Sequence, residues 1–275
     1  MARPALAVLV PGPAGDGSWV DAALASYDGV VAGEDVVVVH GTPDRLPDAD
    51  VVLAHGIQYA PLVRAAPDRT VVMSDVPASV EGLGHATLVD WAWYEAARVA
   101  GRVAAVVADG LPVGLVAGPA VPTQRKVADA FSAGVADAGT GCATVAVHLP
   151  SFDDVAGGRG AGTRLVEAMG CRVLLGTADG AGDAAAEQAR AAGALTLGFL
   201  RPHPDDLGHV LSDVTGVLRG LVTDALATGR TGTAAGHDRP VHAGLASGHL
   251  DLVLSDHVGA AAVRARADAL AAYAG

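Results

Sequence analysis

Short apolar runs alternate with longer alanine-rich segments along the chain. The runs are rich in Val and Leu, which is typical of strands buried in a parallel sheet. The segments between them have the composition of helices that cover such a sheet. In the first part of the chain, the expected strands are residues 5–10, 36–40, 51–54 and 70–73, and the expected helices are residues 20–27, 61–66 and 91–107.

The same alternation starts again after Gly110. Here the expected strands are 113–117, 144–149, 173–175 and 195–200, the expected helices are 123–138, 163–169, 183–192 and 210–227, and short strands at 241–245 and 252–254 precede a closing helix. We therefore predict an α/β protein with two lobes, each a mainly parallel sheet flanked by helices. We expect residues 1–109 and 211–254 in lobe one and residues 110–210 and 255–275 in lobe two.

Polar, glycine-rich turns follow several of the expected strands. In open α/β sheets, ligands bind beyond the carboxyl ends of the strands, so we expect these turns to contribute to a ligand-binding site. They lie at residues 12–18, 55–59, 176–182 and 200–209.

Composition excludes several classes of protein. Thirty acidic residues against eighteen basic ones give a formal charge of −12, which repels the phosphates of nucleic acids. No apolar run reaches the length of a membrane span, so we expect no insertion into a bilayer. The sequence begins with neither a secretory signal nor a lipid-accepting cysteine. As written it predicts a cytoplasmic location, or an extracytoplasmic one if a signal has been removed.

The turn after the first strand reads PGPAGDGSWVD, residues 11–21. Its glycines allow the backbone to approach a ligand closely, and Trp19 offers a flat face for stacking. The side chain of Asp16 or Ser18 can instead cap the following helix, with Trp19 packed inside the lobe. Both interpretations stay open on sequence alone.

The order of several segments resembles the basic membrane protein (BMP) family, the nucleoside-binding receptors of ABC transporters. GDGSW resembles the family's D-x-S-F turn, and VVMSD at 71–75 resembles its strand ending in Asp. The other similar segments are DADVVLAHGIQYA at 48–60, DWAWYEAARVAG at 90–101, VGLVAG at 113–118, DAFSAGV at 129–135, LPSFDD at 149–154 and TADGAG at 177–182. The resemblance extends over about residues 5–260.

This resemblance implies a two-lobed, type I periplasmic-binding fold that closes around a small molecule. Family members hold purine nucleosides by aromatic stacking on the base and by carboxylate hydrogen bonds to the ribose. The resemblance implies a small-molecule ligand, an ABC permease as partner if the chain is exported, and no cofactor or metal. The positions implied to bind ligand are Asp16, Ser18, Trp19, Asp21, His55, Tyr59, Asp75, Trp91, Trp93, Asp179, Arg201 and His203.

The chain departs from the family where the ribose is expected to bind. The family's Asn after the first-turn aromatic is Val20, and a Lys expected soon after the family's V-D-S-D-Q segment is replaced by Thr215. The family's V-D-S-D-Q segment is here FLRPHPDD at 199–206, which places Arg201 among the expected carboxylates. A guanidinium suits an acidic or carbonyl group better than a hydroxyl. We therefore predict an aromatic ligand with such a group, and weak or no binding of unmodified purine nucleosides.

Three alternatives remain at this stage. HPDD at 203–206 is similar to the metal motif of zinc de-N-acetylases, and further histidines stand at His209, His237, His242 and His257. A biosynthetic enzyme on the same scaffold could use His55, Asp90, Glu95 or His203 for acid–base work. A ligand sensor would need a DNA-binding partner or a fused DNA-binding module, because this acidic chain has no helix-turn-helix element.

Overall fold

The computed structural model describes residues 3–16, 18–77, 80–229 and 240–274 and divides the chain into two compact units. The first unit comprises Met1–Trp91 and Asp213–Ala243, and the second comprises Ala92–Ser212 and Gly244–Gly275. Each unit has its own six-stranded sheet, which confirms the predicted two-lobed α/β fold.

The first unit is built on a wholly parallel sheet with the strand order β11-β5-β4-β3-β1-β2. Its strands are β1 (Leu6–Val10), β2 (Val36–His40), β3 (Val51–His55), β4 (Thr70–Ser74), β5 (Thr87–Trp91) and β11 (Val241–Ala243). Its α-helices are α1 (Trp19–Ala25), α2 (Ala60–Arg64) and α7 (Val214–Thr228). Every residue of β1 is fully buried, as a central strand covered on both faces requires.

The second unit has the strand order β12-β10-β9-β8-β6-β7, in which only β12 runs antiparallel to its neighbour. Its strands are β6 (Val113–Ala117), β7 (Thr144–His148), β8 (Val173–Gly176), β9 (Leu195–Phe199), β10 (Gly208–Ser212) and β12 (Leu250–Leu254). Its α-helices are α3 (Trp93–Ala108), α4 (Pro122–Asp137), α5 (Val155–Thr163), α6 (Asp179–Ala191) and α8 (Ala260–Leu270).

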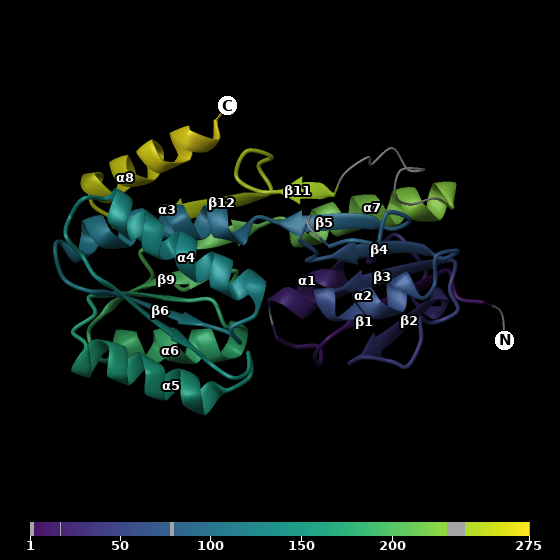
Figure 1. Ribbon diagram of the computed structural model, residues 1–275, viewed down its shortest axis with the longest axis horizontal. Helices are drawn as coiled ribbons and strands as arrows, with labels where there is room; N and C mark the ends of the chain where they lie inside the picture. Colours follow the sequence, from purple (N-terminus) through teal and green to yellow (C-terminus); the bar gives the residue numbers. More distant parts are fainter. Residues whose placement is uncertain (1–2, 17, 78–79, 230–239, 275) are drawn as a thin grey trace. The chain divides into compact units, whose positions relative to one another are not determined.

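The helices of the second unit form two layers, with α3, α4 and α8 on one face of the sheet and α5 and α6 on the other (Figure 1). Glycine makes the close approach of α3 and α4 feasible. A methyl group at Gly134 would overlap the backbone carbonyl of Arg98, and one at Gly101 would overlap that of Phe131. The DAFSAGV segment therefore acts as a helix-packing element.

The observed units differ from the expected lobe boundaries. We expected residues 92–109 and 244–254 in lobe one, but both segments belong to the second unit. The reason is packing: α3 lies against α4 and α8, and β12 pairs with β10. Two strands were also missed, because β5 runs directly into α3 and because β10 lies where a helix was predicted to begin.

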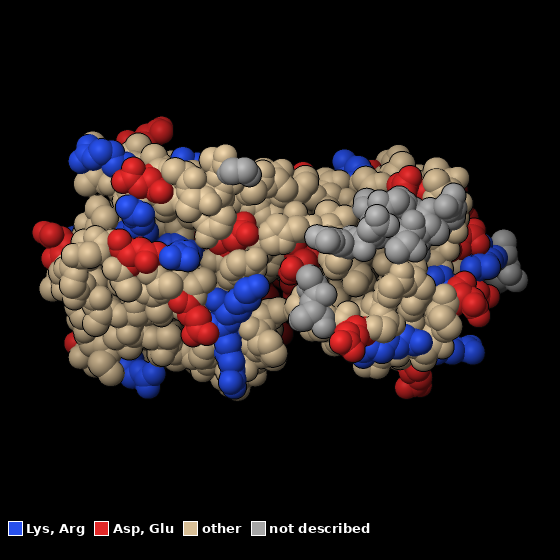
Figure 2. Space-filling model, turned by 45° about the horizontal axis from the view of Figure 1, so that its top comes forward, with Lys and Arg blue, Asp and Glu red and all other residues tan. Residues whose placement is uncertain are grey.

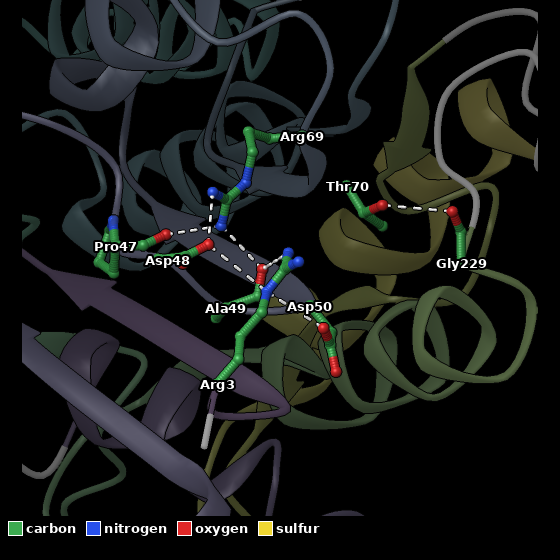
Figure 3. A network of polar contacts seen from close by, with 8 residues as sticks. All are labelled: Arg3, Pro47, Asp48, Ala49, Asp50, Arg69, Thr70 and Gly229. Carbon is green, nitrogen blue, oxygen red and sulfur yellow. Dashed lines mark hydrogen bonds and ion pairs between the residues drawn. The ribbon is translucent and has the colours of Figure 1, made fainter. Parts of the chain in front are cut away.

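A polar network fixes the amino ends of β1, β3 and β4 (Figure 3). The guanidinium of Arg69 donates hydrogen bonds to the carbonyl oxygens of Pro47 and Ala49, at 2.8 and 2.7 Å, and pairs with Asp48 at 3.0 Å. Arg3 donates to the same Ala49 carbonyl. This edge of the first sheet is therefore anchored by backbone acceptors.

Surface charge does not form a broad patch on the face seen in Figure 2, where basic and acidic side chains of the described residues are interspersed. Among the described residues, no helix combines the length and the apolar character needed to cross a bilayer.

Candidate functional site

Three aromatic side chains meet at the carboxyl edge of the first sheet. Trp19 begins α1 after the first turn, His55 ends β3 and Trp91 ends β5. The rings of Trp19 and His55 pack together with centroids 3.8 Å apart and planes tilted by 32°, and Trp91 meets Trp19 edge-on at 6.5 Å. Trp19 is partly exposed, while Trp91 and His55 are buried beneath it. We call Trp19, His55 and Trp91 the aromatic cluster.

His55 supports Trp19 in two ways. Its ring packs against the indole, and its Nε2 lies 3.1 Å from the Trp19 backbone carbonyl. A carbonyl oxygen only accepts hydrogen bonds, so Nε2 must carry the proton and Nδ1 must be an acceptor. Within the part of the chain that the structure describes, Nδ1 has no hydrogen-bond partner. Desolvation lowers the pKa of His55 to about 3, so the imidazole is neutral at physiological pH.

The remaining first-unit positions surround this cluster. The Nε1–H of Trp91 donates to the buried Ser74 hydroxyl at 2.9 Å, which ties β5 to β4. Asp75 follows β4 in a left-handed conformation, with φ of 62°. A non-glycine residue in this region of backbone space is uncommon and marks a constrained turn.

The first turn uses its carboxylates to hold its own backbone. Asp16 accepts hydrogen bonds from the backbone N–H groups of Ser18, Val20 and Asp21, at 2.9, 2.8 and 3.0 Å. Asp21 in turn accepts one from Gly15 at 2.7 Å. Asp16 therefore supplies the carboxylate at the start of α1, and the capping interpretation of this residue holds in the structure. The effect is to fix Trp19 at the beginning of the helix.

Tyr59 belongs to the hydrophobic core of the first unit. Its side chain is fully buried there, and its hydroxyl donates to the Gly41 carbonyl at 2.9 Å. Burial raises the pKa of this phenol. The structure thus gives Tyr59 a packing role.

In the second unit, Trp93 begins α3 and packs against Phe199 at the end of β9, with ring centroids 5.5 Å apart. Trp93 is only 8% exposed. The two tryptophans of the DWAW segment therefore belong to different units. Lys126, the only lysine, lies over the ring of Tyr94 at 3.5 Å.

A pocket of about 390 Å³ lies wholly within the second unit, at the carboxyl ends of β8 and β9. α6 and the loop between β9 and β10 supply most of its walls, and α5 adds one side. Arg201 and His203, both predicted from sequence, line it. Asp179 begins α6 with φ of 43°, next to the lining residue Gly180.

Three ion pairs line this pocket, and we call its residues the charge-paired pocket. They are Arg201–Asp183 at 2.8 Å, Arg190–Asp206 at 2.9 Å and Arg159–Glu187 at 3.6 Å. In the second pair Asp206 is buried and Arg190 is partly exposed, and Thr196 donates to the same Asp206 oxygen at 2.5 Å. Burial raises the pKa of Asp183, while Arg201 opposes that rise.

The HPDD segment therefore divides between two environments. The Asp206 carboxylate accepts hydrogen bonds from Arg190 and Thr196. His203 and Asp205 are exposed, and the distance from His203 Nδ1 to Asp205 Oδ2 is 3.8 Å. Among the described residues, no group of three or more His, Cys, Asp or Glu side chains is placed to hold a metal ion. His237 lies outside the described residues.

The sequence analysis did not identify the charged residues that α6 contributes to the charge-paired pocket. Asp183, Glu187 and Arg190 sit on α6 at a spacing that places them along one helical face. That spacing was the available signal. Their partners are supplied by α5 and by the loop after β9, which the sequence does not place beside this face.

Comparisons with known proteins agree with this architecture. Residues 87–199 match the Bmp family model, described as ABC transporter substrate-binding protein PnrA-like. The resemblance to that family is thus confirmed over this segment. No curated protein matches the sequence.

Several solved structures have similar folds. An ABC transporter solute-binding protein from Aeropyrum pernix K1 is 19% identical, with a TM-score of 0.75 over 99% of this chain and 87% of that one. One from Conexibacter woesei DSM 14684 is 19% identical, with a TM-score of 0.72 over 99% and 97%. A transcriptional activator of the comK gene from Bacillus halodurans is 16% identical, with a TM-score of 0.75 over 98% and 97%. At these identities the likeness shows the fold alone.

Proposed function

With residues 87–199 matching the PnrA-like substrate-binding family as the premise, we propose that this chain is the substrate-binding component of an ABC transporter. The family match carries this proposal, because the fold alone is shared by a solute-binding protein and a transcriptional activator. The protein binds one small organic molecule and releases it unchanged.

The aromatic cluster supports a planar or aromatic ligand. His55 packs against the face of the Trp19 ring and Trp91 meets it edge-on. These contacts fix the Trp19 ring before any ligand binds. Fixing a stacking surface in advance lowers the conformational cost of binding. Trp19 is therefore the residue that we assign to ligand stacking.

The loop after β9 supports a ligand with an acidic or carbonyl group. Where ribose-binding carboxylates were expected, this loop has Arg201 in the lining of the charge-paired pocket. An unpaired sugar hydroxyl in a closed site costs about 1–3 kcal/mol, so losing those carboxylates disfavours purine nucleosides. We therefore propose that adenosine, guanosine and inosine are poor ligands.

The partner that follows from this role is an ABC permease, met outside the cytoplasmic membrane if the chain is exported. Cell fractionation followed by co-purification with a tagged permease tests both parts. Recovery of the protein only in the cytosol, bound to a transcription factor, would replace the transport role by ligand sensing.

The main experiment identifies the ligand directly. Purified protein is incubated with a small-molecule extract of its native cells, desalted and denatured, and the released compounds are identified by mass spectrometry. Wild-type protein should retain one aromatic compound at near-equimolar amounts, and the Trp19→Ala variant should retain much less. Recovery of a chemically altered product would show an enzyme, and no enrichment over a control protein would contradict the proposal.

A further inference from the structure

The charge-paired pocket is balanced in charge, which bears on the kind of group it can bind. Its lining includes three guanidinium groups, from Arg159, Arg190 and Arg201, and three carboxylates, from Asp183, Glu187 and Asp206. Each guanidinium is already paired with one of these carboxylates. An anionic ligand that binds one of these arginines would therefore be repelled by the carboxylate already paired with it.

The three pairs differ in how much they can still offer to a ligand. Asp206 is 2% exposed and accepts from both Arg190 and Thr196, so this pair forms a closed structural unit. Arg159 and Glu187 are separated by 3.6 Å, and their side chains are 58% and 68% exposed. Arg201 and Asp183 lie between these extremes, with side chains 50% and 41% exposed.

A single contact joins Arg201 to Asp183 in the described part of the chain, from Nη1 to Oδ2 at 2.8 Å. The guanidinium has further N–H donors, and the carboxylate has a second oxygen. The pair therefore presents a donor and an acceptor side by side. Its complement is a neutral group with a carbonyl oxygen next to an N–H, because the carbonyl accepts from Arg201 while the N–H donates to Asp183.

We propose that Arg201 and Asp183 together recognise an amide or lactam edge on the ligand, and that Asp183 excludes carboxylates and phosphates. This inference rests on the proposed function and narrows its ligand from an acidic or carbonyl group to a carbonyl flanked by N–H. Arg201 alone suits an anion, but Arg201 paired with Asp183 does not. Asp183 is the specificity-determining residue, because its carboxylate stands beside the Arg201 guanidinium at 2.8 Å.

Matched pairs of aromatic probes test this assignment. Nicotinamide against nicotinate, and benzamide against benzoate, differ only in whether an amide or a carboxylate is attached to the ring. Calorimetric titration of the wild-type protein should show at least tenfold tighter binding of the amide in at least one pair. Tighter binding of the acid, or no binding of any amide up to millimolar concentration, would overturn the proposal.

Three variants distinguish a specific effect of the Arg201–Asp183 pair from a general effect of charge in the pocket. Asp183→Asn removes the carboxylate at nearly constant shape and should lower the amide-to-acid preference at least tenfold, while Arg201→Gln should weaken both probes. Glu187→Gln removes a carboxylate from the same pocket and should leave the preference within threefold. An equal shift in Glu187→Gln and Asp183→Asn would overturn the assignment to this pair. Because both acids are substantially exposed, the thermal unfolding midpoint should change little in either variant.

The ligand recovered from cell extract gives a separate check. A recovered compound with an amide or lactam edge agrees with the inference. A recovered carboxylate or phosphate without such an edge overturns the inference and leaves the proposed binding function intact. Retention of no compound would instead contradict the proposed function itself.

Discussion

The carboxyl edges of the two sheets carry different chemistry. In the first unit this edge holds an aromatic cluster whose one titratable member, His55, is neutral and fully buried. In the second unit it holds a pocket lined by three ion pairs. A flat aromatic face binds many planar molecules equally well, whereas fixed donors and acceptors discriminate among them. Under the proposed function, stacking on the ligand falls to the first unit and selection among ligands falls to the second.

The largest effect that we expect comes from removing the buried Asp206 carboxylate, which pairs with Arg190 in the second unit. Asp206→Ala leaves Arg190 without its carboxylate and should lower the free energy of unfolding by about 3–5 kcal/mol. Urea denaturation measures this change. Asp205→Ala is the matched control, because its side chain is 77% exposed, and it should change stability by less than about 0.5 kcal/mol. Equal effects from the two variants would show that the pocket is not built on the Asp206 pair.

The next largest effect that we expect is a loss of ligand affinity when Trp19 is replaced. Trp19→Ala should weaken binding of the recovered ligand by about 1–3 kcal/mol, the range measured for aromatic stacking on a base. Titration calorimetry with wild-type protein and Trp19→Phe, which keeps a smaller ring, provides the reference. A variant that loses stability but binds normally would make Trp19 a core residue and remove stacking from the first unit.

His55 predicts a pH dependence of stability. Its pKa is about 3 in the folded chain and 6.5 in the reference state, so the unfolded chain binds the extra proton as pH falls below 6.5. Stability contributed by the neutral imidazole is thus lost progressively from about pH 6.5 down to about pH 3, at a slope near 1 kcal/mol per pH unit. His55→Gln should remove this part of the slope. Parallel stability curves for wild type and variant between pH 4 and 7 would contradict the burial of His55.

The smallest effect that we expect is on stability, in a variant that changes the hydrophobic core and leaves the aromatic cluster intact. Tyr59→Phe removes the hydrogen bond to the Gly41 carbonyl and should lower the free energy of unfolding by about 1 kcal/mol. Ligand affinity should not change, because the Tyr59 side chain is fully buried in the hydrophobic core. A loss of affinity in calorimetry without a loss of stability would return Tyr59 to the site.

The sequence allowed the α/β fold to be predicted because buried parallel strands are continuously apolar, as in β1 and β3. It did not reveal β5, since Trp91 and Trp93 stand in one short segment although a strand ends at the first and a helix begins at the second. The boundary between units was missed for a related reason. α3 adjoins the first unit in sequence, but it packs on α4 through Gly101 and Gly134.

The candidate site was predicted in part. Trp19, Trp91 and His55 could be named because each lies near the carboxyl end of a strand, where parallel sheets carry ligand groups. Asp16 could be assigned either to ligand or to a helix cap, and its three backbone contacts in the structure show the cap. The pairing of Arg201 with Asp183 joins residues 18 positions apart, on a loop and a helix, and no local pattern encodes it.

The central claim is that this binding protein takes an aromatic ligand that is not an unmodified purine nucleoside. Isothermal titration of the wild-type protein with adenosine, guanosine and inosine tests that claim most directly. We expect no binding, or dissociation constants well above the micromolar range, because Arg201 stands in the loop after β9 where the family resemblance implies ribose-binding carboxylates. Micromolar or tighter binding of any one of the three would contradict it and would assign the ribose to Asp205 or another carboxylate of the second unit.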